Sequence, residues 1–432
     1  MLIMQALNRT IAPDTFPIGN AKLLPVKEGV LDNKIPVYTV KGGDQEVLKI
    51  DFIFDAGLWF QSNNLVASLA NSMLNEGTDK TTAAQIAEWF DFRGAYIQLS
   101  VDQNWAYVSV LTLNKHAEEI IAITEEIIKH SVFPQQQLDA ILLKRKNRFI
   151  VENQKAKTIC QKQFTQALFG QQHPYALTTT LEDFEKVNRD TLYQFYQNYY
   201  HADNCKIVVA GNPSDNVFAL LNQHFGGNDW SKPLQASPAT PIVAPTNEKS
   251  QYIVHDDAIQ TAIRMGNHIV NQTHPDYPEL QVVNTILGGY FGSRLMANIR
   301  EEKGYTYGIY SLMLSLTEGA YFYITTEVDK QYYNATINEI HNELKRLRTE
   351  PVSAEELAVV KNYMLGELLR DMDGPFAQSA MIKNLLEFEM DNSFIQQQIS
   401  AIHNCTPERI MELANTYFNE NDLITMAVGA PQ

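Results

Sequence analysis

The stretch that decides the fold covers residues 287–311 and reads LGGYFGSRLMANIREEKGYTYGIYS. The glycine pair at residues 288–289 predicts the end of one helix, and Ser293 can begin a short second helix. Gly304 stands where a left-handed C-terminal cap would end that second helix. Residues 305–314 then predict a strand, because they are rich in aromatic and aliphatic side chains. The sequence therefore predicts a helix-to-strand turn around Gly304.

Arg300 and Tyr307 lie seven residues apart across this turn. The predicted geometry puts the guanidinium of Arg300 at the helix end and the phenol of Tyr307 on the strand, so both can point toward one place. Together they can bind a carbonyl or an oxyanion. Each residue also has an ordinary structural explanation. A helix C-terminus favours a cation such as Arg300, and an aromatic-rich strand favours a tyrosine such as Tyr307.

The order of these elements, a glycine pair, SRL, IRE, a glycine and Y-x-Y, resembles the C-terminal half-motif of the pitrilysin-like zinc peptidases. This inverzincin family includes mitochondrial processing peptidase and insulysin, and the resemblance implies that Arg300 and Tyr307 bind substrate. The resemblance extends over nearly all of the chain. It implies an α+β fold in which two homologous α/β-sandwich halves, joined by a linker, face each other as a partial clam-shell.

The family also carries an H-x-x-E-H motif on a helix of the N-terminal half, usually followed by a Gly-Thr pair. The matching segment, residues 68–78, reads SLANSMLNEGT, so the functional positions hold Ser68, Asn71 and Ser72. Zinc needs imidazole or carboxylate donors, and an amide cannot act as a general base. Glu152 lies near the place where the family supplies a third ligand, but one carboxylate is not a site. We therefore expect no metal and no catalytic residue in this chain alone.

The other histidines and the cysteines offer no alternative zinc site. None of the ten His residues forms a ligand pair at helical spacing. Cys160, Cys205 and Cys405 are far apart and form no C-x-x-C motif, which is typical of buried thiols in a reducing compartment.

Composition and charge exclude several other classes of protein. The chain has 432 residues, of which 45% are hydrophobic, and this predicts two or three domains. The net charge of −16 and the lack of a long basic block argue against nucleic-acid binding. The densest basic run, residues 144–148, fits a solvated helix face. The first ten residues do not have the pattern of a signal peptide, and no later stretch resembles a membrane span. We expect a cytoplasmic protein without a membrane partner.

Residues 226–250 are rich in Pro, Ser, Ala and Gly and predict a linker. The linker separates an N-terminal α+β domain, residues 1–225, which holds the degenerate zinc motif, from a C-terminal α+β domain, residues 251–432, which holds the Arg/Tyr motif. An internal repeat with an offset of about 215 residues supports this division. In each copy a strand is followed by an amphipathic helix, a turn that contains Pro, and a longer helix.

The resemblance leads to one hypothesis and one alternative. The chain would be the non-catalytic, substrate-binding subunit of a heterodimeric zinc metalloendopeptidase that acts on unfolded peptides. A homologous partner with an intact H-x-x-E-H motif would supply zinc, the water and the base, while Arg300 and Tyr307 would orient the peptide. The alternative is a non-enzymatic structural or peptide-binding protein of the same fold. A self-sufficient peptidase would need zinc donors that the sequence does not contain.

Overall fold

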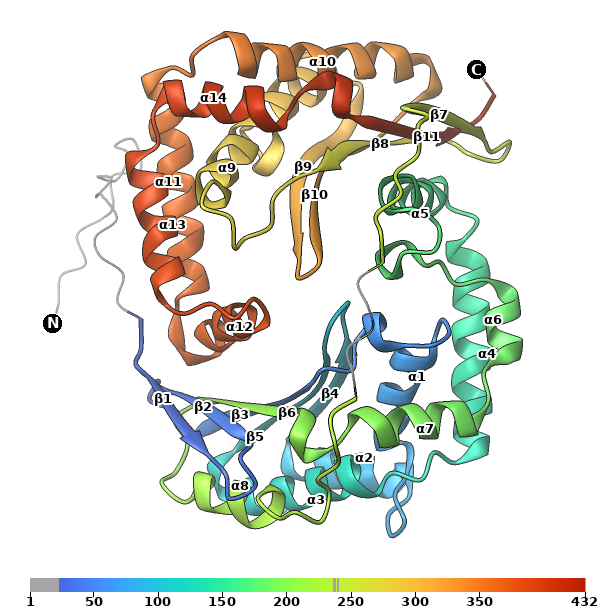
Figure 1. The fold of residues 1–432 in the computed structure, drawn as a ribbon, viewed down its shortest axis with the longest axis vertical. Helices are drawn as coiled ribbons and strands as arrows, with labels where there is room; N and C mark the ends of the chain where they lie inside the picture. The colour runs from blue at the N-terminus through green and yellow to red at the C-terminus, as the bar shows by residue number, and fades with distance from the viewer. Residues whose placement is uncertain (1–22, 236–237, 239–240, 432) are drawn as a thin grey trace, which may run out of the picture.

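The computed structural model describes residues 23–235, 238 and 241–431, and it contains two β-sheets covered by helices (Figure 1). The predicted α+β class with two facing halves is confirmed. The segment that was tested for a signal peptide lies outside the described residues. The predicted domain boundaries stay a prediction. Between Phe225 and Ser250, the described residues form no helix or strand.

The first sheet has six strands in the order β1-β2-β6-β3-β5-β4, so β1 and β4 are its edges. Its strands are β1 (Val26–Val30), β2 (Pro36–Lys41), β3 (Val47–Phe54), β4 (Tyr96–Val101), β5 (Ala106–Leu113) and β6 (Cys205–Gly211). The central strands β3 and β6 are almost completely buried, as expected for runs of aliphatic residues with side chains buried on both faces.

The first half contains the helices α1 (Val66–Met73), α2 (Ala83–Arg93), α3 (Ala117–His130), α4 (Gln135–Glu152), α6 (Leu181–Lys186), α7 (Arg189–Tyr199) and α8 (Val217–Phe225). Helices α1, α2 and α3 contact the edge strand β4 or its neighbour β5, whereas α4 and α6 contact each other. The T-x-x-Q pattern at residues 82–85 predicts a helix start and Gly94 predicts its end, and α2 has both ends where the sequence places them. Thr82 and Gln85 form a capping box at its start, and Gly94 ends it with a φ of 59°.

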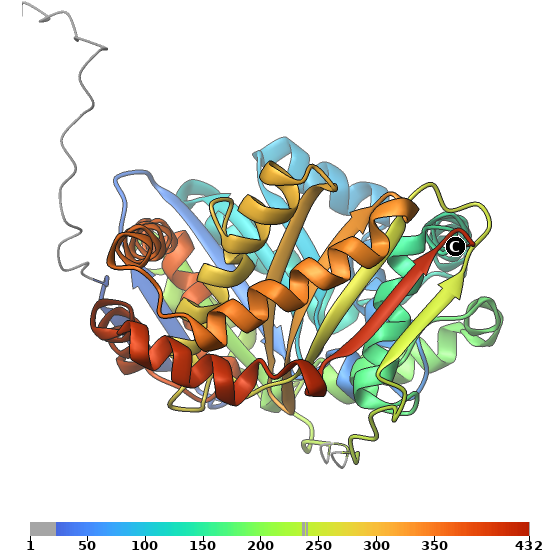
Figure 2. The same ribbon diagram turned by 90° about the horizontal axis from the view of Figure 1, so that it is seen from above.

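The second sheet has five strands in the order β7-β11-β8-β10-β9, so β9 is an edge strand. Its strands are β7 (Ser250–Val254), β8 (Thr261–His268), β9 (Thr306–Leu316), β10 (Gly319–Val328) and β11 (Ile424–Gly429). The helices of this half are α9 (Tyr277–Asn284), α10 (Tyr333–Thr349), α11 (Ala354–Asp371), α13 (Ser393–Asn404) and α14 (Pro407–Tyr417). Figure 2 shows α10 and α14 covering the outer face of the second sheet.

Each half also sends one helix to the sheet of the other half. Helix α5 (Ala156–Phe169) packs on β8 and β11 of the second sheet, where Phe164 and Met426 share one buried cluster. Helix α12 (Gly374–Glu387) packs on β6 and β2 of the first sheet, where Leu386 contacts the cluster that contains Trp105. Figure 1 shows both helices beside the sheet of the opposite half. This exchange fixes the two halves relative to each other.

The two halves also meet at the turns of two hairpins. Asn104, in the turn between β4 and β5, donates to the hydroxyl of Thr317 at 2.5 Å, and Thr317 lies in the turn between β9 and β10. Tyr175 lies 3.3 Å from the same hydroxyl. The edge strands β4 and β9 therefore end close to each other, one from each half. No helix in the described part of the chain is long and apolar enough to cross a membrane.

Candidate functional site

The Arg/Tyr stretch forms the predicted helix-to-strand turn. Arg300 lies in η7 (Met296–Glu302), a helical segment with the wider π-type turn, and Tyr307 is the second residue of β9. Gly304 lies between them with a φ of 66°, and its amide donates to the carbonyl of Arg300 at 3.2 Å. A side chain at this position would strain the backbone. Gly304 therefore ends the helix with the left-handed cap that the sequence predicts.

Arg300 contacts the backbone of β9. Its Nε donates to the carbonyl oxygen of Tyr307 at 3.0 Å, and its guanidinium carbon lies 4.5 Å from the ring centroid of Phe291. The latter contact is a cation–π interaction. Nη1 also lies 3.5 Å from the carboxylate of Glu301, in an exposed pair that contributes little stability. The structure thus brings Arg300 and Tyr307 together through the backbone, and their role in substrate binding stays a prediction.

The side chain of Tyr307 is 92% exposed, so it does not pack against the rest of the protein. Its backbone, in contrast, is held on both sides. The hydroxyl of Thr306 donates to the carbonyl of Glu327 at 2.8 Å, and the hydroxyl of Thr326 donates to the carbonyl of Gly308 at 2.9 Å. The strand-packing explanation for Tyr307 therefore does not apply. Sequence reasoning did not identify the two threonines, whose contacts cross from β10 to β9.

Other residues of the same stretch serve packing. Arg294 makes two hydrogen bonds to the carboxylate of Glu356 on α11, at 2.8 and 2.9 Å. Gly288 lies in the π-helical turn η6 (Thr285–Gly289), where an added Cβ would stand 2.6 Å from the amide nitrogen of Ser311. The missing side chain allows η6 to touch β9. These contacts place η7 and β9 in a fixed arrangement around Arg300.

The degenerate zinc motif lies on α1, and a cation from α4 lies against it. Arg145 donates from Nη1 to the hydroxyl of Ser68 at 2.9 Å and from Nη2 to the carbonyl of Ser68 at 3.2 Å. Nη2 also donates to the hydroxyl of Ser72. The two serines therefore bind a guanidinium. Burial, and the nearby charge of Arg148, lower the pKa of Arg145.

Asn71 has a structural role between these two serines. Its side chain is buried, and its Nδ2 donates to the carbonyl of Tyr107 at 3.2 Å and to the hydroxyl of Tyr200 at 3.1 Å. Because the amide connects α1 to β5 and to the residue after α7, it stabilises the position of α1. An amide has no basic lone pair on nitrogen, so it cannot remove a proton from water.

The donor set on α1 does not fit a zinc ion. Hydroxyl groups are poor zinc ligands, and the guanidinium of Arg145 would repel a divalent cation at this distance. Glu152 lies at the end of α4, away from the serines, and pairs with Lys155 at 2.7 Å. Among the residues that the structure describes, no group of three or more His, Cys, Asp or Glu could hold a metal ion.

The solvated-face interpretation of residues 144–148 is wrong for Arg145, which is half-buried against α1. The signal was present in the sequence. Residues 141, 144, 145 and 148 follow the spacing of one helix face, so a cation at residue 145 shares its face with Ile141. The neighbouring charged residues made the whole run resemble a solvated helix face.

A pocket of about 310 Å³ lies next to the degenerate motif, between α1, the edge strand β4 and α4. We call it the basic pocket, and it is lined by Ser72, Asn75, Glu76, Leu99, Ile141, Lys144, Arg145 and Arg148. Three of these side chains are cations. The basic pocket therefore occupies the part of the fold where the resemblance predicts zinc chemistry, but with the fixed positive charge of protein side chains.

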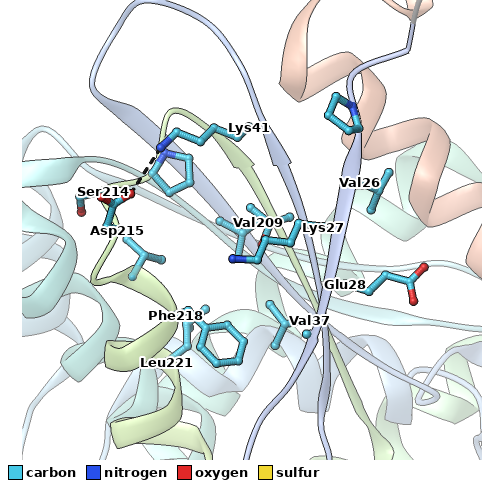
Figure 3. Close-up of a pocket in the computed structure, with 15 residues that line it drawn as sticks. Val26, Lys27, Glu28, Val37, Lys41, Val209, Ser214, Asp215, Phe218 and Leu221 are labelled. Atoms are coloured by element: carbon cyan, nitrogen blue, oxygen red, sulfur yellow. Dashed lines mark ion pairs between the residues drawn. The ribbon is translucent and has the colours of Figure 1, made fainter.

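A different pocket, of about 360 Å³, lies at the far edge of the first sheet (Figure 3). Its walls are mainly apolar and come from β1, β2, β6 and α8, with Val37, Val209 and Phe218 among the residues that line it. Lys41 and Asp215 form an ion pair of 3.6 Å at its rim, shown dashed in Figure 3. The pocket contains no residue of the Arg/Tyr stretch or of the degenerate zinc motif.

Two facing α+β halves, with the Arg/Tyr stretch on one of them, are typical of the pitrilysin-like peptidase fold. Residues 186–364 match the family described as the Peptidase M16 inactive domain. The sequence is 24% identical over 365 residues to the uncharacterized zinc protease YmxG of Bacillus subtilis, covering 83% of this chain and 87% of that protein. It is 21% identical over 365 residues to the non-peptidase homolog YmxG of Helicobacter pylori, covering 83% of each chain.

Solved structures show the same fold. A peptidase M16 inactive domain from Pseudomonas fluorescens superimposes with a TM-score of 0.86 at 21% identity and covers 95% of this chain and 99% of that chain. A chain of complex III from Candida albicans superimposes with a TM-score of 0.74 at 15% identity and covers 94% of this chain and 96% of that chain. These findings confirm the predicted resemblance to the pitrilysin-like zinc peptidases, the M16 family.

Proposed function

We propose that this chain is the non-catalytic, substrate-binding subunit of a zinc endopeptidase and works with a homologous chain that carries H-x-x-E-H. One observation carries the proposal. Tyr307 exposes its whole side chain, whereas its own backbone and the guanidinium of Arg300 are fixed by hydrogen bonds. An exposed phenol on a backbone that is held in place, beside a guanidinium fixed by a hydrogen bond, is suited to bind a peptide carbonyl or a developing oxyanion.

In this proposal the partner chain holds the zinc ion, and this chain holds none. The guanidinium of Arg145 lies where Ser68 and Ser72 replace the expected histidines. Zinc in the partner would polarise the peptide carbonyl and activate water. Arg300 and Tyr307 would hold the peptide in place for that reaction.

The substrate would be an unfolded peptide that lies beside an edge strand. Both β4 and β9 have one unpaired edge in the described sheets, and an edge strand can accept a further strand. On β9 the alternate residues Tyr310, Leu312 and Leu314 are each 41–45% exposed. They follow Tyr307 along the strand and offer apolar contacts to a bound peptide. A folded protein would not present an extended segment of this kind.

The cytoplasmic location and the absence of membrane and nucleic-acid partners, both expected from the sequence, are part of the proposal. The structural neighbour PqqL of Escherichia coli is described as a periplasmic protease, and this chain covers 48% of it. Cell fractionation with an antibody against this chain decides between the two compartments.

The alternative is a non-enzymatic structural or peptide-binding protein. Two relatives favour it, since the Helicobacter pylori protein is described as a non-peptidase homolog and one neighbour is a chain of complex III. A purely structural protein gives no reason for the exposure of Tyr307 next to a fixed Arg300, whereas a non-enzymatic peptide-binding protein would use the two residues without cleavage. We prefer the two-chain peptidase, and a cleavage assay separates it from both.

The test is to co-express this chain with the homologous H-x-x-E-H chain of the same genome and to purify the two together. Cleavage of a quenched fluorescent unfolded peptide is then measured for each chain alone and for the mixture, and zinc is measured by emission spectroscopy. The proposal predicts cleavage by the mixture, none by this chain, and zinc in the partner chain only. Zinc bound by this chain with cleavage by it alone would contradict the proposal. A failure of the two chains to associate would favour the alternative.

A further inference from the structure

The cations of the basic pocket come from one face of α4. Lys144, Arg145 and Arg148 have the spacing i, i+1 and i+4, and all three line the same pocket together with Ile141. Residues three and four positions apart lie above one another on a helix. Three positive charges are therefore gathered on one wall, in a chain whose net charge is −16.

None of these cations forms an ion pair within the described part of the chain. Arg145 donates only to the neutral oxygen atoms of Ser68 and Ser72. Lys144 and Arg148 have no hydrogen bond or carboxylate partner among the described residues. Lys144 and Arg148 are exposed, whereas Arg145 is half-buried without a counter-ion, which is unfavourable, so an anion that binds beside Arg145 gains more than it would on an open surface.

Glu76 is the one carboxyl group that lines the basic pocket. Within the described residues it forms no ion pair with the three cations. Burial raises the pKa of Glu76 and so disfavours its negatively charged form. Glu76 therefore leaves the positive charge of the opposite wall available to a ligand.

The matching pocket of the second half has the opposite character. It lies between α9, β9 and α11, has a volume of about 390 Å³, and includes Glu367 and Asp371 among its lining residues. Both carboxylates are paired with Arg370, at 2.7 and 3.6 Å. Unpaired positive charge is thus a property of the first-half pocket and not of this position in the fold in general.

The edge strand β4 lies beside the basic pocket, so a peptide that paired with β4 would pass the pocket. Leu99 of β4 lines the pocket, and along β4 the side chains alternate between the two faces of the sheet. A peptide added to the free edge of β4 would direct every second side chain to the face where Leu99 lies. One of these side chains can reach the cations on α4.

We propose that the basic pocket binds a carboxylate of the peptide, so that the substrate class is acidic unfolded peptides. The proposal rests on the proposed peptide-binding function and specifies its substrate. Arg145 and Arg148 bind the carboxylate, and Lys144 adds charge at the rim. A cation of the protein itself thus recognises the substrate at the place where the resemblance predicts a metal.

The test measures the binding of labelled peptides to the full chain by fluorescence anisotropy. One short unstructured peptide carries a single Glu, a second carries Gln in its place, and each is made with a free and with an amidated C-terminus. The variants are Arg148→Gln, which breaks no hydrogen bond of the described structure, and Arg145→Gln. Arg370→Gln on α11 is the matched control, because it removes the same charge from the residue that pairs with Glu367 and Asp371 of the other pocket.

We expect the Glu peptide to bind about tenfold to 100-fold more tightly than the Gln peptide, and Arg148→Gln to remove most of this difference. Added salt should weaken only the acidic peptide. An effect of amidation instead would assign the pocket to the C-terminal carboxylate and would overturn the acidic substrate class. Equal binding of all four peptides would overturn the acidic pocket but leave the peptide-binding function intact. The absence of any binding would count against both.

Discussion

Because α12 packs on the sheet of the other half, we predict how much Lys383 contributes to the stability of that contact. This residue of α12 inserts its ammonium 3.0 Å from the carboxylate of Asp51, which is 1% exposed in β3. Lys49 lies 3.2 Å from the same carboxylate, and Ser109 also donates to it. Burial lowers the pKa of Lys383 even though Asp51 raises it, so the pair is costly to remove from water.

Lys383→Met keeps the length of the side chain and leaves Asp51 with Lys49 as its only cationic partner. Removal of one member of a buried pair costs about 3–5 kcal/mol. Because Lys49 stays, we expect a loss of about 2 kcal/mol in the free energy that holds α12 on the first sheet. This corresponds to a rise of about 30-fold in the opening of α12.

Native-state hydrogen exchange of the amides of α12 measures that opening directly. Arg370→Met is the matched control, because Arg370 pairs with Glu367 in an exposed position and should change stability by less than about 0.5 kcal/mol. If Lys383→Met changes exchange in α12 no more than this control does, the contact between α12 and the first sheet does not hold the halves together as we argue.

Three further changes test separate parts of the structure. Burial, and after it the charge of Asp102, raises the pKa of Glu387 from 4.5 to about 7. Because the folded state holds this proton more tightly than the unfolded state, the free energy of unfolding falls as the pH rises from about 4.5 to about 7. Urea melts from about pH 5.5 to about pH 8 should show Glu387→Gln gaining about 1–2 kcal/mol over the native chain as the pH rises, and a constant difference would contradict the assignment. Gly288→Ala places a Cβ 2.6 Å from the backbone of β9 and should cost about 1–3 kcal/mol in urea melts, whereas Gly366→Ala, with nothing within 4 Å, should be neutral or stabilising. Ser68→His with Ser72→His should bind no zinc while Arg145 is present and should bind it when Arg145→Glu is added. Equal zinc affinity with and without Arg145, measured by calorimetric titration, would show that its charge does not prevent metal binding.

Local chemistry made much of the fold predictable from the sequence. The capping box at Thr82 and the left-handed glycines Gly94 and Gly304 end or begin helices where the sequence places them. The strand after Gly304 was expected to end at residue 314 and continues to residue 316. These features depend on residues close together in the chain, which is why they could be read without a structure.

Long-range packing was not predictable in the same way. Phe164 and Leu168 are buried four residues apart on α5, but this spacing does not indicate that their cluster belongs to the sheet of the other half. The same limit applies to the site. The sequence predicts Arg300 and Tyr307 as a pair from their local spacing, and their role stays a prediction, whereas the contact of Arg145 with Ser68 crosses 77 residues and needs the packing of α4 on α1. Composition alone predicts that such a basic run is exposed to solvent.

The most direct test of the central claim is steady-state cleavage of an unfolded peptide by the reconstituted pair with Tyr307→Phe or Arg300→Ala in this chain. Tyr307 is almost fully exposed, so Tyr307→Phe removes one hydroxyl without disturbing the core. The account predicts that turnover falls by about 100-fold to 1000-fold for the loss of an oxyanion donor, while association of the pair stays unchanged and the melting temperature changes only for Arg300→Ala, which also loses its hydrogen bond to the carbonyl of Tyr307. Unchanged turnover by both variants in a pair that cleaves normally would contradict it.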